Sequence, residues 1–270
     1  DIDLTKPSLY INRELIQIEI KRRVLQECYA YHTLLDSVNF LSIFKSNIDE
    51  FFLVRVSGLM QQVLMCTTDT KADGLTPREQ LVAIHRVVTQ LYAEATSIWQ
   101  DELYPQLEDE GIKVLNYRQL RARSKKKLRT YFDREIFPVL TPLAFDPSRP
   151  FPHISNLSLN LAVVVRDPQT DKTNFARVKV PAILPRLVPL KPIDPDELLA
   201  PAEQNFVWLE EVIAANLDRL FPGMEIVDSY PFRITRNTDM EIQEEEADDL
   251  LLTMEENLRQ RHFGSVVRLE

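Results

Sequence analysis

The apolar residues of this chain change their spacing near residue 100, and this change constrains the fold more than any other feature. Before that point they recur three and four positions apart, the spacing of one face of an α-helix. The three apolar stripes are Ile11, Leu15, Ile18, Leu25 and Cys28; Phe40, Phe44, Asn47, Phe51 and Val54; and Leu81, Ile84, Val88, Leu91, Ala95 and Ile98. Because such helices bury their apolar faces against one another, we expect a small antiparallel helical bundle that ends near Gly111.

The third helix carries a clear start signal. Thr76, Pro77 and Glu79 form the pattern of a capping box with proline at the first helical position. The sequence therefore predicts a helix that begins at residue 77.

Beyond Gly111 the pattern is mixed. We expect strands at residues 112–116, 157–167, 175–182, 224–236 and 265–270, and helices at residues 118–136, 205–223 and 247–264. The second and third of these strands flank the turn-rich stretch DPQTDKTN, which predicts a hairpin. The predicted fold class is α+β, with a helical amino-terminal domain at residues 1–111 and a mixed α/β head domain at residues 112–270. A terminal strand needs a neighbour, so we expect the natural chain to continue past Glu270.

Several classes of site are excluded by what the sequence lacks. No two of the five glycines lie within ten residues of each other, so neither a P-loop nor a G-x-G-x-x-G dinucleotide motif is present. The two cysteines form no C-x-x-C pair, and the four histidines are scattered. We therefore expect no metal site built from this chain alone.

The charge is unevenly distributed. The chain has 32 basic and 41 acidic residues, a net charge of −9. The stretch 239–256 holds nine acids and no lysine or arginine, and the rest of the chain is neutral. Because nucleic-acid binding requires a basic face, we expect no nucleic-acid partner. No apolar run reaches the roughly 20 residues that cross a bilayer, so we expect no transmembrane segment. We expect a cytoplasmic location, with peripheral membrane association as an alternative.

Asn47 is the unusual residue of the second stripe, because its stripe neighbours are aromatic or aliphatic. Its amide could be satisfied by the backbone or by Arg55. Alternatively, the helix could present the amide to a polar ligand edge such as a purine or ribose. Asp49 and Glu50 point in different directions on a helix, so we expect a solvated face or a salt bridge to Lys45 or Arg55, not paired acid–base chemistry.

Two basic features leave alternatives open. The cluster Arg121, Arg123, Lys125, Lys126, Lys127 and Arg129 fits either a solvated helix start or a polyanion site. Arg233 and Arg236 fit either an ordinary surface strand or an anion or subunit contact. His153 has the pattern of a loop histidine.

Five segments together resemble the bacterial polyphosphate kinase family. They are YINREL (10–15), FLSIFKSNIDEFFLVRVSGL (40–59), LTPREQL (75–81), FPVLTPLAFDPSRPFPHISNLSLNLAVVV (137–165) and PFRITRNTDMEIQEEEADDLL (231–251). They follow the family's order through nearly the whole chain, and they resemble its amino-terminal helical domain followed by its head domain.

The resemblance implies transfer of the terminal phosphoryl group of ATP to polyphosphate, through a phosphohistidine and with Mg²⁺ present. The histidines and arginines responsible belong to carboxy-terminal catalytic domains, so we assign no catalytic residue and no metal ligand to this chain and expect it to be inactive alone. The family's ATP-contacting asparagine falls on Asn47. The head domain implies contacts of a homo-oligomer, a dimer or larger.

The sequence departs from the family pattern at several positions. Ile16, Gln17, Ile20 and Lys21 replace the usual Ser, Trp, Phe and Asn, and Lys45 stands where a serine is common. These changes bear on the packing of the first helix and on the nucleotide pocket. Two alternative functions remain open: a non-catalytic assembly module, and polyanion binding through residues 121–129.

Overall fold

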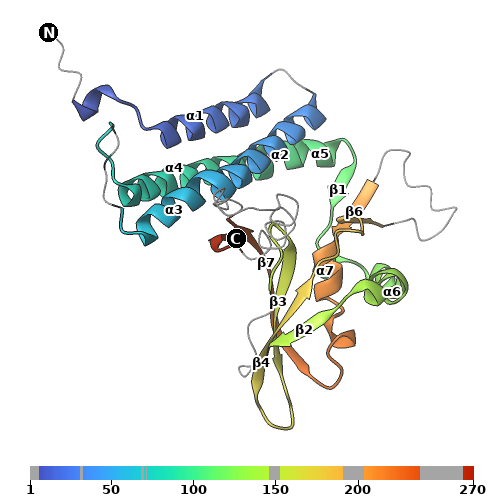
Figure 1. Ribbon diagram of the computed structural model, residues 1–270. Coiled ribbons are helices and arrows are strands. Elements are labelled where there is room, and N and C mark those ends of the chain that lie inside the picture. The colour runs from blue at the N-terminus through green and yellow to red at the C-terminus, as the bar shows by residue number, and fades with distance from the viewer. Residues whose placement is uncertain are drawn as a thin grey trace, which may run out of the picture. The chain divides into compact units, whose positions relative to one another are not determined.

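The computed structural model describes residues 6–30, 33–67, 70, 72–145, 153–190, 204–237 and 264–270 (Figure 1). The chain divides into two compact units. The helical unit comprises Asp1–Gln106 and Thr235–Arg268, and the sheet unit comprises Leu107–Ile234 and Leu269–Glu270.

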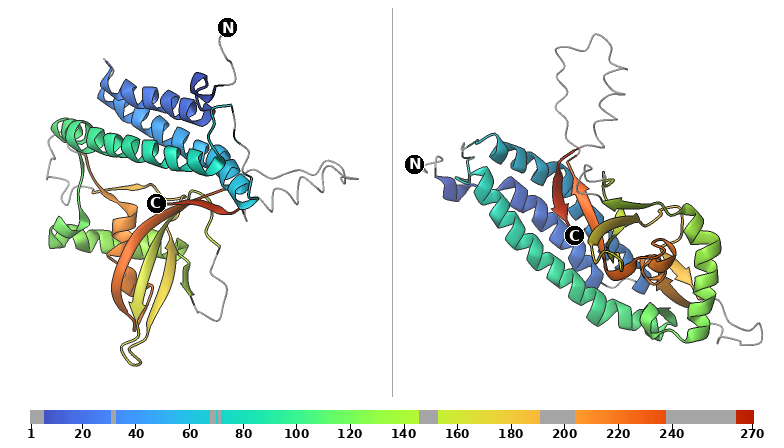
Figure 2. Two further views of the ribbon diagram at one scale, coloured as in Figure 1. Left: turned by 90° about the vertical axis from the view of Figure 1, so that its left-hand side faces the viewer. Right: turned by 90° about the horizontal axis from the view of Figure 1, so that it is seen from below.

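The described part of the helical unit is built on three long helices that run in alternating directions (Figures 1 and 2). The elements from its start are η1 (Pro7–Leu9), α1 (Arg13–Gln26), η2 (Glu27–Tyr29), α2 (Leu34–Phe51), the π-helical turn η3 (Phe52–Val56), α3 (Ser57–Leu64), α4 (Pro77–Ser97), the π-helical turn η4 (Ile98–Leu103) and α5 (Tyr104–Asp109). This arrangement confirms the predicted helical bundle.

The three stripes supply the core of this unit. Ile18, Phe44, Ile84 and Leu91 are at most 2% exposed. Ile11 is an exception, because it is 76% exposed and precedes α1. The helix cannot include it, since the Asn12 side chain caps α1 by accepting hydrogen bonds from the first backbone N–H groups.

The predicted start of α4 is confirmed. The Thr76 hydroxyl accepts a hydrogen bond from the Glu79 N–H at 3.3 Å, and the Glu79 carboxylate accepts from the Thr76 N–H at 2.8 Å. Pro77 occupies the first helical position. These contacts satisfy two donors that a helix otherwise leaves unpaired.

The remaining described strands and helices form two sheets and their covering helices. They are β1 (Ile112–Val114), η5 (Tyr117–Gln119), α6 (Ala122–Tyr131), the π-helical turn η6 (Phe132–Ile136), η7 (Phe137–Val139), β2 (Pro142–Phe145), β3 (Leu159–Arg166), β4 (Thr173–Lys179), β5 (Leu187–Pro189), β6 (Gln204–Trp208), α7 (Leu209–Ala214), η8 (Leu217–Arg219), β7 (Glu225–Arg236) and β8 (Val266–Leu269). The strand orders are β1-β6-β5 and β2-β4-β3-β7-β8. The boundary between the two units passes through α5, β7 and β8.

The predicted hairpin is confirmed, since β3 and β4 pair antiparallel with Val163 opposite Ala176. Leu161, Val163 and Val165 alternate along β3 and are at most 3% exposed. They join Phe132 and Val178 in the core of the sheet unit. The alternation places one face of β3 against the helices that cover the sheet.

The helix predicted over residues 205–223 is wrong in its first four residues and is shorter than predicted. Residues 204–208 form β6, which pairs in parallel with β1, and only Leu209–Ala214 is α-helical. Phe206, Val207 and Trp208 favour a strand once a partner is present, and Val207 is fully buried there. The predicted helix over 118–136 begins later, at Ala122.

The acidic stretch 239–256 and nearly all of the helix predicted over 247–264 lie outside the described residues. No helix in the described ranges is long and apolar enough to span a bilayer.

Candidate functional site

The structure places Asn47 about one turn before the end of α2, where its side chain is half-buried. Phe44 and Phe51 beside it are almost fully buried, whereas Ile43 is 39% and Val54 is 36% exposed. Asn47 therefore lies at the edge of the apolar face, not at its centre. Among the described residues, none forms a hydrogen bond with the Asn47 amide. The interpretation in which the backbone or Arg55 satisfies that amide finds no support in the described contacts.

The opposite side of α2 carries a closed polar cluster. Lys45 Nζ lies 3.1 Å from Asp49 Oδ1, which confirms the expected salt bridge, and it also donates to Tyr92 Oη at 3.0 Å. Asp49 is 7% exposed. Because its carboxylate is buried and paired, Asp49 is poorly placed to act as a general base.

Tyr92 on α4 joins this cluster to β8. Arg268 donates to Tyr92 Oη at 2.7 Å, and its guanidinium carbon lies 4.4 Å from the centre of the Tyr92 ring and 4.7 Å from that of Phe52. The Phe44 ring meets Tyr92 edge-on at 6.1 Å. These contacts, which combine cation–π attraction with a hydrogen bond, fix α2 against α4. Sequence reasoning missed them, because no local pattern links residues 92 and 268.

Lys21 on α1 lies over the ring of Phe51, which follows Asn47 by four residues on α2. Its Nζ is 5.4 Å from the centre of the Phe51 ring and 3.4 Å from the Gln17 carbonyl oxygen. Burial lowers the pKa of Lys21; the Glu50 carboxylate opposes this shift, and the nearby Arg55 guanidinium adds to it.

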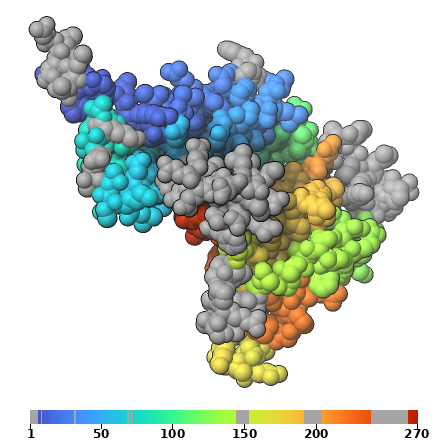
Figure 3. Space-filling view, viewed as in Figure 1, coloured from blue at the N-terminus to red at the C-terminus, as the bar shows by residue number. Residues whose placement is uncertain are grey.

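The other departures from the family pattern on α1 do not disturb the core. Ile16 and Ile20 are 43% and 49% exposed, and α1 lies at the surface of the helical unit in Figure 3. Ile18 and Leu25 on the same helix supply the buried contacts.

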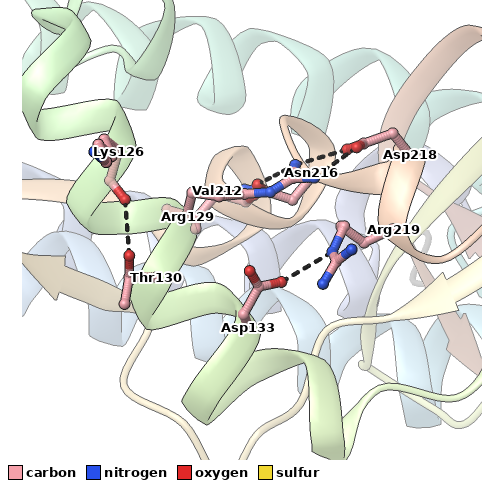
Figure 4. A network of polar contacts seen from close by, with 8 residues as sticks. All are labelled: Lys126, Arg129, Thr130, Asp133, Val212, Asn216, Asp218 and Arg219. Carbon is pink, nitrogen blue, oxygen red and sulfur yellow. Dashed lines mark hydrogen bonds and ion pairs between the residues drawn. The ribbon is translucent and has the colours of Figure 1, made fainter.

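Some basic side chains of the cluster at residues 121–129 already form hydrogen bonds or ion pairs within the chain (Figure 4). Arg129 donates to Asn216 Oδ1 at 2.7 Å and forms a two-bond ion pair with Asp218, with distances of 2.8 and 2.6 Å. The Arg129 guanidinium holds the pKa of Asp218 below its usual value, and Asp218 raises the pKa of Arg129. Lys125 donates to the Arg118 carbonyl at 2.8 Å. The cluster therefore offers fewer free cations than its sequence suggests.

The remaining sequence candidates also have local partners. Arg233 forms an ion pair with Glu270, and Arg236 donates to the Gly264 carbonyl at 2.7 Å. The His153 carbonyl accepts from Arg177 at 2.6 Å. Within the described ranges, no group of three or more His, Cys, Asp or Glu side chains is arranged to hold a metal ion.

Two family models match this chain. The polyphosphate kinase N-terminal domain matches residues 10–115, and the polyphosphate kinase middle domain matches residues 123–270. The chain belongs to the polyphosphate kinase family.

Curated relatives agree with this assignment. A polyphosphate kinase of Synechocystis is 50% identical over all of this chain, and one of Prosthecochloris aestuarii is 45% identical over 99% of it. The chain spans 37% and 38% of the length of these two relatives. The crystal structure of the polyphosphate kinase from Porphyromonas gingivalis matches with a TM-score of 0.66 and 30% identity, over 82% of this chain and 33% of that one. The boundary predicted at residue 111 stays a prediction.

Proposed function

We propose that this chain is the amino-terminal part of an enzyme that transfers the terminal phosphoryl group of ATP to polyphosphate, and that Asn47 contacts the nucleotide. The assignment of Asn47 to the nucleotide rests on one observation. Asn47 presents a half-buried amide that has no hydrogen-bond partner among the described residues. A half-buried amide loses part of its hydration, so a ligand that supplies the missing hydrogen bonds gains affinity there.

The surroundings of Asn47 suit the base or sugar of a nucleotide. Ile43 and Val54 leave apolar surface exposed on either side of the amide, and Phe40 is partly buried in the same row. A flat apolar ring can cover this surface while its polar edge meets the amide. The Lys45, Asp49 and Tyr92 contacts on the opposite side hold α2 in place, which favours a rigid site.

The proposal assigns the reacting groups to parts of the protein outside this chain. Phosphoryl transfer relies on cations that neutralise the moving phosphate, commonly Mg²⁺ together with basic side chains. We place the phosphohistidine and the Mg²⁺ ligands in carboxy-terminal domains, and we assign the sheet unit a role in homo-oligomer contacts. The proposal includes ATP and polyphosphate as substrates and a cytoplasmic location.

The test compares Asn47→Ala with Ser46→Ala in the protein as its gene encodes it. Ser46 is exposed and adjacent on α2, so it is a matched control. We expect Asn47→Ala to weaken ATP binding about fivefold, because a hydrogen bond contributes about 1 kcal/mol and 1.4 kcal/mol is a factor of ten. Isothermal titration with ATP measures the effect. Unchanged ATP affinity in Asn47→Ala would remove the assigned role and favour an assembly module without nucleotide contacts.

A further inference from the structure

A small polar cavity lies in the helical unit beside the π-helical turn that follows α2. Its volume is about 240 Å³, and its lining includes Arg13, Glu14, Arg55, Gly58 and Gln62. Arg13 and Glu14 come from the first turn of α1, and the other three come from η3 and α3. The cavity therefore brings together the start of the first helix and the end of the helix that carries Asn47.

The π-helical turn Phe52–Val56 determines how Arg55 is presented. An extra residue in a helical turn rotates the residues after it, and such turns recur at functional sites. The Ser57 hydroxyl lies 2.7 Å from the Leu53 carbonyl oxygen and 2.9 Å from that of Val54, so it supports the turn from its far end. Arg55 is thereby held half-buried at the cavity wall.

Arg55 lacks a partner within the described chain. No described residue forms an ion pair or a hydrogen bond with its guanidinium, and the same holds for Arg13. A guanidinium has five N–H donors, and partial burial without a partner is unfavourable. Glu14, which is 4% exposed, is the carboxylate of the lining.

The charges around the cavity favour an anion. Arg13 and Arg55 in the lining outnumber Glu14, and Lys21 lies close enough to Arg55 to respond to its charge. Guanidinium groups bind phosphate oxygens through paired N–H donors, and the Gln62 amide adds a neutral donor. The volume is small for a whole nucleotide, because ligand pockets usually exceed about 300 Å³, but it has room for phosphate groups.

We propose that this cavity is a phosphate subsite, in which Arg55 and Arg13 bind phosphoryl oxygens of a phosphoanhydride ligand. The inference rests on the proposed function, which supplies two ligands of this chemistry: the triphosphate of ATP and the polyphosphate chain. Asn47 and Arg55 are eight residues apart, which is about 12 Å along a helix at 1.5 Å per residue. One nucleotide can therefore contact both, with its base at Asn47 and its phosphates at the cavity.

The test uses three probes on the protein as its gene encodes it: tripolyphosphate, ATP and adenosine, each titrated at one fixed ionic strength. Arg55→Gln and Arg13→Gln remove the two cations, and Arg86→Gln removes an equal charge from an exposed position on α4. We expect each cavity variant to weaken tripolyphosphate binding about tenfold. Adenosine binding and the Arg86→Gln variant are expected to match the wild type.

A second pair of variants tests the cavity without touching its arginines. No heavy atom lies within 4 Å of a Cβ built on Gly58, so a side chain can enter the cavity there without a clash. We expect Gly58→Gln to weaken tripolyphosphate binding several-fold. Gly58→Glu should weaken it further because it adds a negative charge. These variants, with Arg13→Gln at an exposed position, keep the test decisive if Arg55→Gln fails to fold.

The probes separate the two sources of phosphate. Parallel losses for tripolyphosphate and ATP assign the subsite to the nucleotide, whereas a loss for tripolyphosphate alone assigns it to the polyphosphate chain. Tripolyphosphate affinity equal to wild type in the Arg13 and Gly58 variants overturns the subsite. Asn47→Ala reports separately, because the proposed function predicts that it weakens adenosine and ATP binding and leaves tripolyphosphate binding unchanged.

Discussion

The arginine–carboxylate pairs of the sheet unit and the side chains at the edge of α2 in the helical unit differ in whether described residues already pair with them. In the sheet unit, Arg129 pairs with Asp218, Arg166 with Glu225 and Arg186 with Glu210, all at 2.5–2.6 Å. In the helical unit, Asn47 and Arg55 are half-buried, and no described residue satisfies either of them. Side chains that neighbours have already paired stabilise a fold, whereas partly buried groups without partners are available to a ligand. The comparison directs the search for ligand contacts to the helical unit.

The largest effect should come from removing a buried member of the sheet unit's network. Asn216 is 1% exposed, accepts from Arg129 at 2.7 Å and donates to the Val212 carbonyl at 2.6 Å. We expect Asn216→Ala to destabilise this unit by about 2 kcal/mol, because the Val212 carbonyl loses a buried hydrogen bond and the Arg129 guanidinium loses a part-buried one. Hydrogen exchange of the amides of α7 measures the change.

The matched control for this prediction is Asn174→Ala, at an exposed position on β4, which should leave the exchange unchanged. ATP affinity should be the same in both variants. A loss of ATP affinity in Asn216→Ala would break the distinction between the two units.

A smaller effect is expected at the paired cluster of the helical unit. Tyr92→Phe keeps the ring contacts but removes the oxygen that accepts from Lys45 and Arg268. We expect a loss of about 1 kcal/mol in the free energy of unfolding, because Lys45 retains its ion pair with Asp49 and Arg268 retains its cation–π contacts with the rings at positions 52 and 92. Denaturant unfolding of the encoded protein measures it. A loss above about 3 kcal/mol would show that the hydroxyl does more than these contacts explain.

The smallest effect concerns pH. Arg129 lowers the pKa of Asp218 below its ordinary value of 3.8, so the folded state favours the charged carboxylate. This contribution is complete above pH 3.8 and is lost as pH falls through the lowered pKa. The pair is partly exposed, so we expect less than about 1 kcal/mol. The free energy of unfolding of wild type and Asp218→Asn, measured between pH 2 and 6, checks this prediction. If Asp218→Asn loses as much stability at acid pH as the wild type, the assignment is contradicted.

The sequence predicted the helical unit well, because helical burial follows from spacing within one segment. The stripes through Ile18, Phe44 and Ile84 needed no knowledge of distant residues, and the Thr76 cap is a local signal. The prediction from the sequence failed at residues 204–208, since β6 depends on pairing with β1 about ninety residues earlier.

The candidate site divides in the same way. Asn47 stood out as an amide within an apolar stripe, but Arg55 was considered only as a partner for that amide or for the nearby acids Asp49 and Glu50. The position of Arg55 at a cavity depends on the π-helical turn, and no residue pattern in the sequence predicts that turn. The contact of Tyr92 with Arg268 joins residues 176 positions apart, so spacing could not show it.

The most direct test of the central claim is a crystal structure of the encoded protein with a non-hydrolysable ATP analogue. We expect the Asn47 side-chain amide to lie 2.7–3.2 Å from a polar atom of the base or ribose, the range of an ordinary hydrogen bond. A bound analogue whose polar atoms all lie beyond hydrogen-bonding distance of Asn47 would contradict the claim.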